Sequence, residues 1–343
     1  MNARSLGIAL SLSSLAACTG AAAPPPADQS AFNRATTSVA RGPFRLHADR
    51  RRSWFAAELA HKQSSLLFVS DSGTADVYVY SLPALKLMAT VTGFSQPQGE
   101  CSDNKGNVWI ADTNAQTMYE LSHHGRLVNE IKTTGAYPVS CAWDATTGDL
   151  AVMSLFNGSG TSGDVLVYAS GSGSGVPYTN PSQYYYDFGG YDSEGNLFFD
   201  GLDTNGNFIL SELPRNASSA ETIKVSGGTI YYPGMVAWNT AKRELVVGDQ
   251  SCGNSYASCL YTLGISGKAG TISREIALKN SSGGPICDLV QGALLNGEVA
   301  GSDFDFCGSS PSATYVWAFP GGGNPTNSNA KSDSVPVGAA VSK

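Results

Sequence analysis

The chain has 343 residues, of which 14% are charged and 10% aromatic, and its formal net charge is -7. So few charges exclude a disordered acidic chain and a coiled coil, and the excess of acidic residues argues against a nucleic acid partner. Glycine is enriched, at 39 residues, without a collagen period, which favours many tight turns between short strands. An all-β fold is therefore expected.

The N-terminus has the pattern of an export signal, because the apolar stretch Leu6–Ala16 follows a positive residue and is too short to span a bilayer. The stretch runs into Leu15-Ala16-Ala17-Cys18, which resembles the lipobox of bacterial lipoproteins. This resemblance implies a signal peptide over residues 1–17, lipidation of Cys18 and, from the following Thr19, export to the outer membrane, on its periplasmic or surface face. An ordinary signal peptide with a chance cysteine is the alternative.

Residues 18–50 are small and polar with a run of prolines. Such a segment cannot bury enough apolar surface to fold, so we expect a flexible tether. Arginines gather at its end, either as a solvated basic turn or as a contact with anionic lipid head groups. They are Arg45, Arg50, Arg51 and Arg52.

A short hydrophobic strand that ends in a polar residue recurs through residues 51–343. The six copies end at Asp71, Asp112, Ser154, Asp200, Asp249 and Asp303. A second strand follows each copy, and lead-in strands precede most of them, from Pro97, Pro138, Tyr186, Pro233 and Pro285. Four short strands in each period of about 40 to 54 residues are typical of propeller blades. The sequence thus predicts a six-bladed β-propeller of four-stranded antiparallel blades.

The second copy, Pro97–Asp112, reads PQGECSDNKGNVWIAD and resembles the NHL-repeat family, a propeller family. The other copies keep this frame more loosely. The last blade lacks a clear outer strand after Phe319, which either Val335–Val341 or a strand before Leu66 could supply.

Six cysteines remain after Cys18, an even number that suits an oxidising compartment. Without a C-x-x-C pair, zinc is not expected. In a propeller frame, Cys252 and Cys259 flank one hairpin turn, Cys287 and Cys307 lie at one end of the last blade, and Cys101 and Cys141 lie on neighbouring inner strands. We predict these three disulfides, although the last pair is offset by one residue and leaves strain or another partner open.

Polar residues near the lead-in strands are site candidates, because these segments meet at the central channel of a propeller. The fold class also resembles gluconolactonase-like hydrolases, and this resemblance implies that Glu100, Asp187 and Asp288 together hold a Ca²⁺ ion. The asparagines that complete the set in those enzymes find no match here. Hydrated carboxylates lining the channel are the alternative.

Gln98, Tyr186, Tyr231 and Tyr232 could line a face that binds a protein, peptide or glycan, or they could pack between blades. No catalytic residue is assigned, since no serine-nucleophile motif is present. We therefore predict a lipid-anchored, monomeric, non-catalytic binding propeller without a cofactor. The alternative is a metal-dependent lactonase with Ca²⁺ in the channel.

Overall fold

The computed structural model describes residues 44–46, 65–123, 125–304, 312–329 and 334–343. Within these ranges the chain consists of short strands and one 3-10 turn, η1 (Ala169–Gly171). The expectation of an all-β propeller with four-stranded antiparallel blades is confirmed. Among the described residues no helix has the length and apolar character to cross a membrane.

Three sheets contain four consecutive antiparallel strands each. They are β5 (Pro97–Ser102), β6 (Val108–Asp112), β7 (Thr117–Leu121) and β8 (Leu127–Lys132); β9 (Pro138–Trp143), β10 (Leu150–Ser154), β11 (Asp164–Tyr168) and β12 (Val176–Tyr178); and β21 (Gly292–Leu295), β22 (Glu298–Asp303), β23 (Ala313–Ala318) and β24 (Asn327–Asn329).

A further sheet has eight strands. They are β13 (Tyr185–Tyr191), β14 (Leu197–Leu202), β15 (Phe208–Leu213), β16 (Glu221–Ser226), β17 (Pro233–Asn239), β18 (Glu244–Asp249), β19 (Cys259–Ser266) and β20 (Ala269–Ala277). Each half is a four-stranded antiparallel unit. The halves are joined at their outer strands, where β16 and β20 pair in parallel over three residues.

The remaining sheet combines both ends of the described chain. Its order is β1 (Phe44–Arg45), β4 (Leu87–Thr92), β3 (Asp76–Ser81), β2 (Leu66–Asp71) and β25 (Ala340–Ser342). The C-terminal segment thus supplies the inner strand of the first sheet, and the segment before Leu66 adds an outer one. The expectation that one of them completes the last blade is wrong, because β24 occupies that place.

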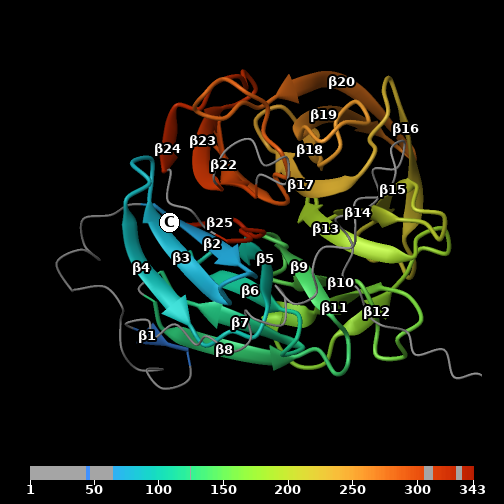
Figure 1. Cartoon of the computed structure of the whole chain (residues 1–343). Helices are drawn as coiled ribbons and strands as arrows, with labels where there is room; N and C mark the ends of the chain where they lie inside the picture. The colour runs from blue at the N-terminus through green and yellow to red at the C-terminus, as the bar shows by residue number, and fades with distance from the viewer. Residues whose placement is uncertain (1–43, 47–64, 124, 305–311, 330–333) are drawn as a thin grey trace, which may run out of the picture.

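The predicted lead-in strand from Pro285 is also wrong, since the last inner strand begins at Gly292. Asp288, within the expected strand, has a φ of 75°, a left-handed conformation that a strand cannot contain. Figure 1 shows β25, β5, β9, β13 and β17 near the centre and β4, β8, β12, β16, β20 and β24 toward the periphery.

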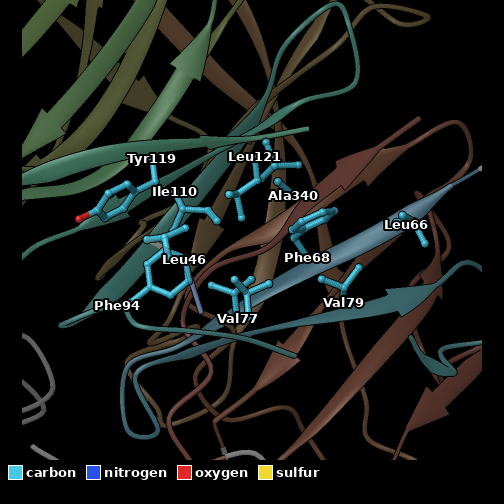
Figure 2. Packing of buried hydrophobic residues seen from close by; sticks show 12 residues of the cluster. Leu46, Leu66, Phe68, Val77, Val79, Phe94, Ile110, Tyr119, Leu121 and Ala340 are labelled. Atoms are coloured by element: carbon cyan, nitrogen blue, oxygen red, sulfur yellow. The ribbon is translucent and has the colours of Figure 1, made fainter. Parts of the chain in front are cut away.

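Apolar clusters fill the space between neighbouring sheets. In the cluster of Figure 2, Phe68 and Val77 of the first sheet pack against Ile110 and Tyr119 of the next. Five aromatic residues of the strands belong to such clusters and fill space between blades; they are Trp109, Tyr119, Trp143, Trp238 and Trp317. Burial of each large apolar side chain contributes roughly 1.5–3 kcal/mol, so these seams hold the blades together.

Two of the predicted disulfides are confirmed. Cys101–Cys141 joins β5 to β9 with a Cα–Cα distance of 5.5 Å, and Cys252–Cys259 closes one turn with a distance of 5.6 Å. Cys287 is disulfide-bonded, and its expected partner, Cys307, lies outside the described residues, as does Cys18.

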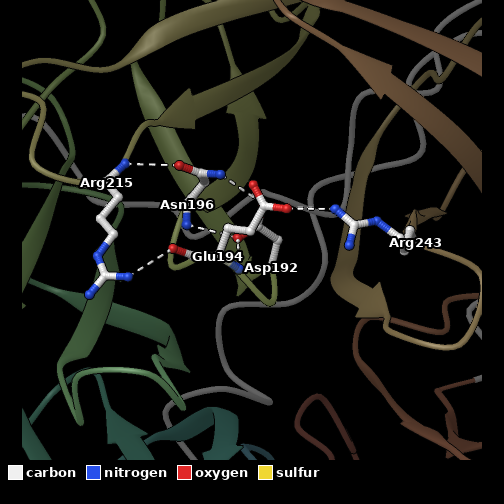
Figure 3. Close-up of polar contacts among 5 residues, drawn as sticks. All are labelled: Asp192, Glu194, Asn196, Arg215 and Arg243. Atoms are coloured by element: carbon white, nitrogen blue, oxygen red, sulfur yellow. Dashed lines mark hydrogen bonds and ion pairs between the residues drawn. The ribbon is translucent and has the colours of Figure 1, made fainter.

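Polar contacts connect the turns that follow the inner strands (Figure 3). Glu194, in the turn between β13 and β14, pairs with Arg243, between β17 and β18, at 2.5 Å. Asn196 of the first turn accepts a hydrogen bond from the Arg215 N–H at 2.9 Å. Both partners of the ion pair are exposed, so it contributes about 0–1 kcal/mol.

The closing segment requires glycine at position 338. A Cβ there would lie 2.3 Å from Gln98 O and 2.9 Å from Ser70 Oγ. Because the Gln98 carbonyl belongs to an inner strand, it cannot move aside freely. We expect Gly338→Ala to lower the free energy of unfolding by roughly 1–3 kcal/mol, as measured by urea denaturation.

Gly264→Ala is the matched control, because a Cβ at position 264 meets nothing within 4 Å. It should change stability by less than about 0.5 kcal/mol. Equal stability of the two variants would contradict closure of the ring by the C-terminal segment.

Candidate functional site

One end of the propeller carries the segments that lead into the inner strands and the turns between the second and third strands of the blades. We call it the entry face. Main-chain hydrogen bonds join lead-in segments to these turns. They run from Thr113 N to Gln96 O, Tyr137 N to Phe156 O, Tyr184 N to Leu202 O, and Gln250 N to Tyr232 O.

Aspartates at the ends of the second strands hold several lead-in segments. Each carboxylate accepts two successive main-chain N–H groups. The sets are Asp112 with Ser95 and Gln96 (2.7 and 2.8 Å), Asp249 with Tyr231 and Tyr232 (both 3.0 Å), and Asp71 with Ser334 and Val335 (2.6 and 3.0 Å). Asp112 and Asp249 also cap the following turn, through the N–H groups of Ala115 and Ser251.

The blade of β9–β12 departs from this arrangement because Ser154 stands where the others have aspartate. The N–H before its lead-in proline therefore bonds a turn carbonyl, whereas the matching N–H groups of Gln96 and Tyr232 bond an aspartate. Tyr137 N donates to Phe156 O at 2.9 Å, and Leu155 N donates to Tyr137 O at 3.1 Å. This pairing brings the Tyr137 and Phe156 side chains together.

Four partly exposed aromatic side chains form a continuous row between this blade and the next. The ring centroids of Tyr137 and Phe156 are 6.3 Å apart, those of Phe156 and Tyr185 are 5.6 Å apart, and those of Tyr185 and Tyr184 are 4.8 Å apart. Each contact is edge to face, with interplanar angles of 88°, 86° and 89°, a favoured aromatic geometry. We call these four residues the aromatic row.

Asp187 lies two residues after Tyr185, where the register between β13 and β14 shifts. Such a bulge re-aims a side chain. The residue is half-buried, but its Oδ2 atom is buried and has no hydrogen-bond partner among the described residues. Burial raises the pKa of Asp187 to about 7.

Asp187 is electrostatically coupled to its surroundings. The pKa of Tyr185 is raised, mostly by burial and to a smaller extent by the neighbouring Tyr184 and Asp187. Burial, followed by the Asp187 charge, raises the pKa of Asp200 well above its usual range. Asp200 accepts hydrogen bonds from Phe188 N at 2.9 Å and Gly234 N at 3.1 Å, so it links neighbouring inner strands.

Glu100, on β5, is only 2% exposed. Its Oε1 accepts a hydrogen bond from the Ser70 hydroxyl, and its Oε2 is buried without a partner among the described residues. The Gln291 side chain accepts a hydrogen bond from Glu100 N and donates one to Glu100 O, both at 2.8 Å. Burial raises the pKa of Glu100 to about 8.

Asp288 precedes β21 and is half-buried, and burial raises its pKa to about 7. In the described part of the chain, only Cys252, Cys259 and Glu275 place three ligand atoms within 4.8 Å of one another, and the two cysteines form a disulfide. The structure therefore does not bring Glu100, Asp187 and Asp288 together, and their positions give the Ca²⁺ interpretation no support.

The four predicted ligand-binding residues are placed differently. Tyr186 is 1% exposed, stacks on Phe199, and its hydroxyl bonds the Asn180 main chain, so it is a core residue and not available to a ligand. Tyr231 is 40% exposed, and Tyr232 and Gln98 are partly exposed. None of the four belongs to the aromatic row.

Tyr137 and Phe156 were not identifiable as a pair from the sequence pattern, because they come from different segments. A signal was present, since Tyr137 directly precedes a lead-in proline and Phe156 follows the one strand end that has serine instead of aspartate.

No protein-family model matches the sequence, and no curated protein matches it. Solved structures share its fold. A nidogen/laminin complex superposes with a TM-score of 0.62 at 10% identity, covering 82% of this chain and 99% of that one. A Bacteroides caccae protein described as of unknown function has a TM-score of 0.60 at 12% identity and covers 81% and 99%.

TolB from Acinetobacter baumannii gives a TM-score of 0.57 at 8% identity, over 81% of this chain and 66% of that one. These structures are β-propellers, so the similarity establishes the propeller fold of this chain. At such low identity it establishes nothing about the site.

The buried Glu100 predicts a pH dependence of stability. Its pKa rises from 4.5 in the unfolded chain to about 8 in the fold, so the folded state binds the extra proton between these values. Stability therefore falls as the pH rises from about 4.5 to about 8, by roughly 1.4 kcal/mol per pH unit for one such group. Glu100→Gln should flatten urea-midpoint curves between pH 5 and pH 8.

Parallel curves for wild type and Glu100→Gln would show that Glu100 is ionised in the fold.

Proposed function

We propose that this chain is a propeller that binds a protein or peptide partner at the aromatic row. The observation that carries the proposal is the continuity of four partly exposed rings on one rigid face. Large aromatic side chains dominate the energetics of protein interfaces and lose little conformational entropy when they bind. A pyranose ring stacks on one flat aromatic face. Because the rings of this row alternate between face and edge, their surface is uneven and better suited to peptide side chains.

The surrounding structure supports a preformed site. The Cys101–Cys141 disulfide joins β5 to β9, the inner strand of the blade that carries Tyr137 and Phe156. The Ser140 hydroxyl donates to the Asp187 carbonyl and thereby links β9 to β13. A rigid face reduces the ordering cost of association. The fold also occurs in a nidogen/laminin complex, an example of a propeller within a protein complex.

We further infer that the ring contains six blades. The basis is that the two halves of the eight-stranded sheet are each antiparallel and four-stranded, with their own inner strands β13 and β17, and that strand-to-strand pairing joins them at the outer pair β16 and β20. Counted as two blades, they complete a ring with the other four sheets.

We propose that the chain acts as an exported lipoprotein. Cys18 in its lipobox-like sequence supports acylation, and the two disulfides suit an oxidising compartment. In a Gram-negative host fed an alkyne-labelled fatty acid, the wild type should carry the label and fractionate with membranes. Cys18→Ser should lose the label completely, and an equally labelled variant would contradict the proposal.

Binding at the aromatic row can be tested with the full-length protein on an array of random dodecapeptides. Wild type should select a reproducible set of peptides. Tyr185→Leu should weaken these signals by roughly tenfold, because it removes the central ring. Tyr185→Phe should restore them, since the ring remains.

Tyr256→Leu is the matched control, because Tyr256 is 48% exposed and lies outside the row. Thermal melting of each variant separates lost binding from lost folding. A wild type that selects no peptides, or a Tyr185→Leu variant that selects the same set, contradicts the proposed function; selection of glycans in place of peptides contradicts it as well.

A further inference from the structure

We propose that the partner inserts a cationic side chain, lysine or arginine, between the aromatic row and Asp187. This inference rests on the proposed function and specifies the chemistry of the same site. It follows from three features: the distribution of charge along the chain, an unpartnered buried carboxylate oxygen, and tyrosine rings close to that carboxylate.

The charge distribution is strongly uneven. Residues 133–214, which form β9–β15, contain nine Asp and Glu residues and no Lys, Arg or His. This stretch carries a formal charge of -9, whereas the whole chain carries -7, so the rest of the chain is slightly positive. All four members of the aromatic row lie within it. Asp164, Asp187, Asp200 and Asp203 lie toward the entry face, where their charge favours the approach of cations and disfavours acidic partners.

Asp187 supplies a specific acceptor within this acidic sector. Its Oδ2 atom is buried and lacks a hydrogen-bond partner among the described residues, a state that costs free energy unless a donor arrives. Asp187 takes no part in the ion pairs of the described residues, which are Lys132–Glu130, Arg243–Glu194 and Lys268–Glu221. An ammonium or guanidinium group carries several N–H donors and would satisfy this oxygen.

The tyrosines beside Asp187 supply a second attraction. Tyr185 is close enough to Asp187 for the carboxylate to raise its pKa, and both lie on β13. Ring faces attract cations, by about 0.5–1 kcal/mol at exposed sites and by about 2 kcal/mol where water is excluded. Although burial raises the pKa of Asp187 to about 7, a cation beside it favours the ionised carboxylate.

The test uses two copies of the dodecapeptide array. In the second copy, citrulline replaces every arginine and acetyl-lysine replaces every lysine, so that the charge is removed; citrulline also keeps the size of arginine. Full-length wild type should bind the peptides that it selects roughly tenfold more strongly on the native copy than on the neutral one. The preference should shrink as salt is raised from 50 to 500 mM, because screening weakens charge attraction.

Asp187→Asn should bring both copies to the same low signal, and Asp203→Asn should not. Asp203 is the matched control because it lies on the same face, and its carboxylate is already bonded to the amides of its own turn. The comparison of the two copies uses wild type alone, so it remains decisive if Asp187→Asn fails to fold.

The outcomes separate the two proposals. Equal wild-type signals on the two copies, with binding still lost in Tyr185→Leu, overturn the cation inference and leave the aromatic row as a peptide site. Charge preference that persists in Asp187→Asn assigns the cation to another acidic residue and overturns the role of Asp187. Absence of any signal that depends on Tyr185 overturns the proposed function and this inference with it.

Discussion

Each lead-in segment brings main-chain N–H groups to a buried position at the entry face, and the architecture depends on how these groups are satisfied. An unpaired buried N–H costs as much as a lost hydrogen bond. In several blades one carboxylate accepts hydrogen bonds from the N–H groups of two successive residues, as Asp112 does from Ser95 and Gln96. Because this aspartate ends the second strand, the bond fixes the inner strand against its neighbour and sets the blade register.

The exception at Ser154 explains why the aromatic row lies where it does. A serine hydroxyl cannot span two N–H groups as a carboxylate does, and in this blade the Tyr137 N–H bonds the Phe156 carbonyl in place of a carboxylate. Main-chain pairing puts side chains of the two segments directly opposite each other. Tyr137 and Phe156 occupy those positions, so the loss of one structural carboxylate creates the start of a surface of rings.

The sequence was sufficient to predict the strands that repeat and insufficient where the chain departs from its own pattern. The second strands, such as Val108–Asp112, are wholly buried and almost continuously apolar, which makes their period visible. By contrast, β24 is Asn-Ser-Asn and carries no apolar signal. Closure by β25 joins segments more than 250 residues apart, and no local pattern encodes such a pairing.

The site residues show the same limit. Tyr186 belongs to a tyrosine run, yet only alternate positions of a strand share a face, so it enters the core while Tyr185 joins the row. Which positions face outward depends on the register shift between Tyr186 and Gly189. A bulge of this kind leaves little trace in composition. Candidate carboxylates could therefore be named from the sequence, but their surroundings could not.

The buried carboxyl groups of the inner strands are compensated by neutral donors and not by cations. Ser70 serves Glu100, and main-chain amides serve Asp200. Compensation of this kind holds the groups in place but leaves single oxygens unpaired, on Glu100 and on Asp187. Glu100 is enclosed, so its unpaired oxygen is a fixed cost of the fold. Asp187 lies beside partly exposed rings, in a stretch of sequence without Lys, Arg or His. A donor from a partner can therefore relieve the same cost there and contribute to binding affinity.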